Sequence, residues 1–107
     1  MQRDRALNHL KAVRRDLDRL GALESAWFDD AFPPDDRIGF RAEWDNTLDR
    51  FSAVIQAHAA GRLDSDIMAQ LIDIAQDVVA FAPALERMKL RQPAPGDLKE
   101  LGILSAA

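Results

Sequence analysis

The clearest hydrophobic pattern in the chain lies between residues 64 and 90. Apolar side chains recur there at alternating steps of three and four: Ile67, Leu71, Ile74, Val78, Phe81, Leu85 and Met88. This spacing places them on one face of an α-helix. A second apolar row from Met68 to Ala82 runs beside the first, so we expect this helix to touch at least two neighbours. The pattern predicts a helix over 64–91, kinked at Pro83 because proline cannot donate a backbone hydrogen bond.

Two further helices are predicted before it. Leu10, Val13, Leu17 and Leu20 keep a heptad spacing that indicates a helix over 3–31, ended by Pro33 and Pro34. Gly21 within it marks a kink, a close helix crossing, or the end of one helix before a short second one. An apolar row from Phe40 to Ile55 indicates a helix over 36–60, with Asp35 or Asp36 as its N-terminal cap. Gly61 is a suitable residue to end it.

The expected fold is all-α. The short connection around Gly61 predicts that the second and third helices pack antiparallel as a hairpin. With the long N-terminal helix this gives a three-helix up-down-up bundle, followed by a short C-terminal helical turn over 97–102. The apolar residues of that tail are expected to fold back on the bundle: Leu98, Leu101, Ile103 and Leu104. We expect one helical domain over 1–107.

Composition narrows the function classes. The 107 residues contain no cysteine, which excludes disulfides, thiolate zinc sites and cysteine nucleophiles. The N-terminus is charged and no apolar run approaches the roughly 18 residues of a membrane span, so a soluble, cytoplasmic protein with no membrane contact is predicted. The net charge of −4 disfavours general nucleic-acid binding.

Charge is distributed unevenly along the chain. Residues 1–23 carry six basic groups, whereas residues 24–49 carry eight acids. We expect these segments to attract each other, either within one chain or between two copies. A basic face on the first helix could instead meet phosphates, but acidic residues interrupt it, so nucleic-acid association through it ranks last. The residues of this face are Lys11, Arg14, Arg15 and Arg19.

No catalytic, cofactor-binding or metal-binding set is predicted, and an enzyme is the less favoured interpretation. Neither His9 nor His58 follows an acidic residue at the i−3 spacing of a bundle di-metal site. His58 lies on the apolar face of the second predicted helix, where it could act as a general base or ligand or simply pack against the negative end of the helix dipole. A small-molecule or enzymatic pocket around His58 and Glu43 is therefore the second hypothesis for function.

The leading hypothesis is protein–protein interaction. Five aromatic residues gather near the first helix junction, among aspartates, and give more large apolar surface than a slim bundle usually hides. They are Trp27, Phe28, Phe32, Phe40 and Trp44. We expect this cluster to form an interface with a second copy in a homodimer or with another helical protein.

Overall fold

The computed structural model describes residues 1–103. Its helices are α1 (Arg3–Leu23), α2 (Pro34–Ala59), α3 (Ser65–Ala80), α4 (Ala82–Arg87) and α5 (Pro95–Glu100). No strand occurs in this part of the chain, which confirms the all-α prediction. Residues 104–107, including Leu104 of the predicted tail, lie outside the described residues.

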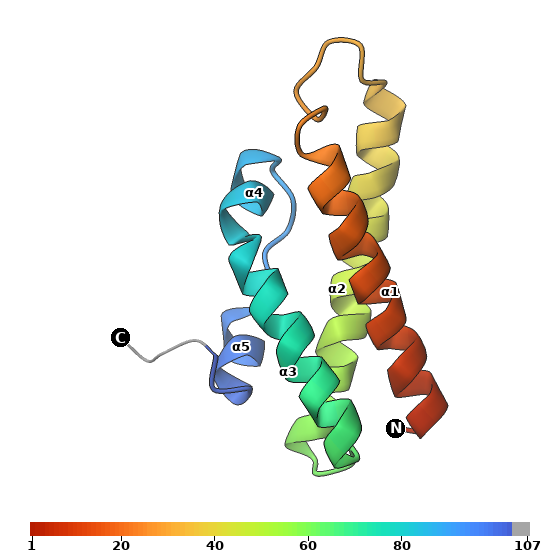
Figure 1. Cartoon of the computed structure of the whole chain (residues 1–107), viewed down its shortest axis with the longest axis vertical. Helices are drawn as coiled ribbons and strands as arrows, with labels where there is room; N and C mark the ends of the chain where they lie inside the picture. The colour runs from red at the N-terminus through yellow and green to blue at the C-terminus, as the bar shows by residue number, and fades with distance from the viewer. Residues whose placement is uncertain (104–107) are drawn as a thin grey trace.

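The core lies where α1 packs against α2 and α3. In Figure 1 these helices lie side by side, with the α1–α2 connection at one end of the molecule and the α2–α3 connection at the other. The heptad row of α1 faces inward, because Leu10, Val13, Leu17 and Leu20 are each no more than 2% exposed. None of the described helices is both long enough and apolar enough to span a membrane.

The first predicted helix is too long. α1 ends at Leu23, and residues 24–32 form successive turns instead of continuing to residue 31. Asp29 closes one of these turns by accepting a hydrogen bond from the Ala31 N–H, which competes with helical bonding. Arg37 of α2 holds the same segment by donating to the carbonyl oxygens of Trp27 and Asp29. Gly21, by contrast, lies within α1 and does not interrupt it.

The second helix begins slightly earlier than predicted, at Pro34, with Pro33 as its N-cap. Asp35 and Asp36 therefore lie in the first turn, where their charges favour the positive end of the helix dipole, and no side chain caps the helix by hydrogen bonding. The predicted stop at Gly61 is confirmed. Its φ of +71° and the bond from the Arg62 N–H to the Ala57 carbonyl form a Schellman motif.

The structure has two helices where a single kinked helix over 64–91 was predicted. The segment divides at Phe81 into α3 and α4, and Pro83 falls in the first turn of α4. Proline has no N–H to lose there, so the chain begins a second helix instead of bending one continuous helix. α4 ends at Arg87, four residues before the predicted end.

The C-terminal segment returns along α2. Trp44 donates its indole N–H to the Arg91 carbonyl at 2.8 Å, and Ser52 donates to the Asp97 carboxylate at 2.8 Å. These bonds position α5, which begins and ends two residues earlier than the predicted turn. Leu98 is buried, and Leu101 and Ile103 pack against the core, so the tail folds back as expected up to Ile103.

Candidate functional site

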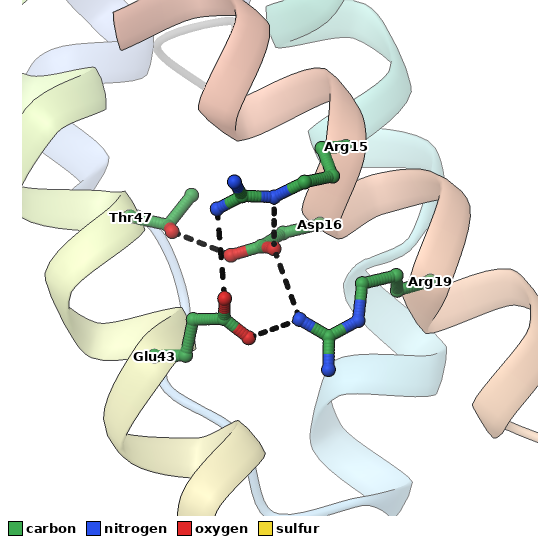
Figure 2. A network of polar contacts seen from close by, with 5 residues as sticks. All are labelled: Arg15, Asp16, Arg19, Glu43 and Thr47. Atoms are coloured by element: carbon green, nitrogen blue, oxygen red, sulfur yellow. Dashed lines mark hydrogen bonds and ion pairs between the residues drawn. The ribbon is translucent and has the colours of Figure 1, made fainter.

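The most deeply buried charged group in the described chain is Asp16, on the inner side of α1. Its side chain has no exposed surface, and it accepts a hydrogen bond from the Thr47 hydroxyl of α2 at 2.5 Å. Figure 2 shows both side chains at the centre of a polar network between the two helices. A carboxylate buried this completely needs partners that compensate its lost hydration.

Arg15 and Arg19 provide that compensation. Their guanidinium groups lie 3.5 Å and 3.8 Å from the second carboxylate oxygen of Asp16. Both also bind Glu43 of α2, so two cations and two anions alternate across the interface (Figure 2). The network therefore joins α1 to α2 through charged and hydrogen-bonded contacts.

Two other basic residues of α1, Arg3 and Arg14, bind acidic residues of α3 and its N-cap. Arg3 bridges Asp64 and Asp66, and Arg14 binds Asp77 at 2.6 Å. The hydrogen bond from Arg3 holds the pKa of the Asp66 carboxyl below its ordinary value and raises that of Arg3. These acids lie outside the acidic segment 24–49, so within residues 1–103 the expected attraction between that segment and the basic one occurs at Glu43, through Arg15 and Arg19.

Glu43 and His58 do not share a pocket. They lie fifteen positions apart on α2, which at 1.5 Å per residue separates them by about 22 Å. Glu43 belongs to the Asp16 network, whereas His58 is half-buried in the last turn of α2, near the negative end of the helix dipole.

His9, on α1, has a pKa below the ordinary histidine value. Its ring is half-buried, and burial lowers the pKa because it disfavours the charged imidazolium. Arg5, also on α1, and Arg50 of α2 lower it further by like-charge repulsion.

Most of the predicted interface cluster is inside the protein. Trp27, Phe40 and Trp44 are at most 3% exposed and belong to the core, and Phe32 is half-buried. Trp27 contacts Phe40 edge-to-face at a centroid distance of 6.0 Å. Arg19 lies over the Phe40 ring, at 5.3 Å. Only Phe28 of the five has a largely exposed side chain, at 62%.

Two of the surface grooves carry charge that bears on function. The larger, of about 680 Å³, lies between α1 and α3, with Leu10 and Ile74 at its floor. Its rim carries the predicted basic face: Lys11, Arg14, Arg15 and Arg19. Because Arg14, Arg15 and Arg19 are already ion-paired, most of the charge on this rim is compensated within the chain.

The second groove, of about 350 Å³, lies between the α1–α2 connection and α4. We call it the cationic groove, defined by Phe28, Asp30, Arg37, Arg41, Arg87 and Lys89. Sequence analysis missed it because its cations come from two distant parts of the chain. No periodicity connects them, and only the packing of α4 near residues 27–41 brings them together.

In residues 1–103, no group of three or more histidine, aspartate or glutamate side chains is placed to hold a metal ion. No family model matches the chain, and no curated protein or solved structure matches it.

Proposed function

We propose that this protein acts by binding another protein, with self-association as the first form to test, through a surface containing Phe28 and Ile38. One observation carries the proposal. Within residues 1–103 these are the two large hydrophobic side chains left exposed, at 62% and 61%, and both lie where α1 connects to α2. Neither is needed to complete the core.

The surroundings of these residues support a contact surface. Arg37 fixes the backbone next to Phe28 through its bonds to the carbonyls of Trp27 and Asp29, at 2.6 Å and 2.9 Å. Phe28 is thereby displayed on a constrained loop, and a constrained apolar side chain loses less conformational entropy on binding. Aromatic residues are also enriched at the centres of protein interfaces.

We infer that this surface is carried by a three-helix bundle in which α1, α2 and α3 run up, down and up. The short helices α4 and α5 pack onto that bundle. The cytoplasm is the compartment we propose, with which a chain without cysteine is compatible. A second copy and another helical protein are the two partners that follow from the sequence.

The test is the solution mass of the chain by light scattering on a sizing column over a range of concentrations. We expect a mass of twice 11.9 kDa, and we expect the variant carrying Phe28→Ser and Ile38→Ser to return to a monomer. Gln76→Ser, an exposed change on α3, is the matched control and is expected to leave the mass unchanged.

A wild-type monomer at the highest concentration would overturn self-association. A dimer that the double variant leaves intact would instead contradict the assignment of the surface to Phe28 and Ile38. Thermal unfolding of each variant checks that the mass is compared between folded proteins.

Of the other two hypotheses, nucleic-acid binding by α1 loses support because most of its cations have carboxylate partners. A pocket around His58 and Glu43 loses support because the two residues are far apart on one helix.

A further inference from the structure

The cationic groove concentrates positive charge in a chain whose net charge is −4. Among its charged residues are four cations, Arg37, Arg41, Arg87 and Lys89, and one acid, Asp30. Arg87 is neutralised by an ion pair with Glu24. The other three cations have no carboxylate within ion-pair distance among residues 1–103.

The positive charges of Arg37 and Arg41 are not compensated by carboxylates within residues 1–103. Arg37 donates to two neutral backbone carbonyls, which orient its guanidinium without cancelling its charge. The Nε of Arg41 is buried and has no hydrogen-bond partner in the described part of the chain.

Lys89 adds a second, independent observation from the backbone. Its φ is 56°, in the left-handed region, and it lies two residues after the last residue of α4. The bonds from the Lys89 N–H to the Glu86 carbonyl and from the Leu90 N–H to the Leu85 carbonyl form a Schellman motif.

Two other helices of the described chain end in the same way, and both place glycine at this position, Gly61 and Gly102. Glycine adopts this conformation without steric cost, whereas a lysine does not. A strained lysine at the edge of a cationic groove is the kind of outlier that binding sites retain.

We propose that the cationic groove binds the phosphate group of a small organic phosphate that carries a flat ring. Arginine presents a planar fork that matches phosphate oxygens, and lysine adds a compact positive charge. Three uncompensated cations suit a doubly charged phosphate monoester better than a single carboxylate. The volume of about 350 Å³ lies near the lower end of the range for small-molecule sites.

The position of Phe28 indicates what kind of group the phosphate is attached to. Its exposed ring lines the same groove, where it can stack on a planar group attached to the phosphate. A nucleoside monophosphate has both parts and is the probe that we choose. This site is separate from the proposed protein-binding activity, although Phe28 contributes to both surfaces.

The experiment measures binding of adenosine monophosphate to the full chain by calorimetry, and by backbone NMR shifts at Phe28, Arg41 and Lys89. Inorganic phosphate alone and adenosine alone are the comparison probes. We expect the monophosphate to bind at least about tenfold more tightly than either part, and more weakly as salt screens the charges.

Lys89→Gly is the sharpest variant, because it removes the charge and relieves the backbone at once. We expect an affinity loss of about tenfold together with an unchanged or higher Tm. Lys89→Arg is expected to keep the affinity, and Arg41→Met to lower it. Lys99→Gly, on the exposed side of α5, is the control that should leave binding unaltered.

Absence of binding at millimolar probe would overturn the proposal. So would binding that Lys89→Gly and Arg41→Met both leave intact, because the phosphate would then lie elsewhere. Equal affinity for inorganic phosphate would contradict the role of Phe28. Because Phe28 contributes to both surfaces, binding is measured at a protein concentration where light scattering gives a monomer, and the two proposals then fail separately.

Discussion

Among single residues, Asp16 is the one whose environment differs most from what its type suggests. The sequence places it among the charges that interrupt the basic face of α1, where a solvated side chain is the ordinary expectation. The structure buries it beside Leu17 and gives it Thr47, Arg15 and Arg19 as partners. From the sequence, position 16 can point either to solvent with the arginines or to a neighbouring helix. Only the packing of α1 on α2 determines that the Asp16 carboxylate is buried.

We predict that Asp16→Ala lowers the free energy of unfolding by about 2–4 kcal/mol. The substitution leaves the Thr47 hydroxyl and two guanidinium groups without their shared acceptor. Urea unfolding followed by circular dichroism measures the change. Asp18→Ala, an exposed change two residues away, is the control and is expected to stay within about 0.5 kcal/mol. Equal effects of the two substitutions would contradict the structural role of the network.

His9 gives a second prediction at this scale, about pH. Its pKa in the folded protein lies below the ordinary histidine value because of burial and of repulsion by Arg5 and Arg50. The unfolded chain therefore binds the proton more readily. We expect the contribution of His9 to stability to be full above about pH 6.5 and to decrease as the pH falls toward its folded pKa.

NMR titration of the His9 ring measures this pKa directly. Arg50→Gln should raise it toward the ordinary value, because one repelling charge is removed. His9→Gln should flatten the decrease in stability on the acid side of neutrality. A titration of His9 that Arg50→Gln leaves unchanged would show that repulsion from α2 plays no part.

At the scale of helices, apolar periodicity predicted which segments are helical but not where two of them stop. The row from Leu10 to Leu20 was sufficient for α1, yet nothing in it showed that Asp29 and Arg37 would hold the following residues as turns. Periodicity likewise continued through Pro83, although the chain begins a new helix there. The end of α1 depends on hydrogen bonds made by side chains outside it, those of Asp29 and Arg37. The apolar periodicity of a helix carries no information about such bonds.

Two glycines should respond to alanine in opposite directions. Gly21 lies inside α1, and an added methyl group would meet the Phe81 ring at an ordinary 3.7 Å. Gly21→Ala is therefore expected to stabilise the protein by about 0.5–1 kcal/mol. Gly61 has a φ of +71°, so Gly61→Ala should destabilise it by about 1 kcal/mol. Thermal unfolding compares the two, and changes of the same sign would contradict the different backbone roles given to them.

At the scale of the whole molecule, the uneven charge of the sequence becomes a set of contacts between helices. Arg3 and Arg14 bind α3, while Arg15 and Arg19 bind α2. The basic N-terminal segment is thus largely satisfied by acids of its own chain. Exposed pairs of this kind contribute little stability each, but they leave few charges for contacts between copies.

This distribution predicts how the association state responds to salt. If copies associate through apolar side chains, the mass of the dimer should be the same at low ionic strength and in about 1 M salt, where screening reduces the Debye length to about 3 Å. Light scattering in both buffers measures it. A dimer that separates in high salt would instead indicate charge pairing between copies.

The sequence by itself determined that this protein is helical, which face of each main helix is buried, and where glycine ends α2. Those properties depend on the spacing of side chains along one helix and on local backbone geometry, and both are set by residues close together in the sequence. Only the tertiary structure decided that Asp16 is buried, that most of the aromatic cluster is core, and that Arg41 and Lys89 line one groove. These depend on contacts between residues far apart in the chain, for which no local pattern exists.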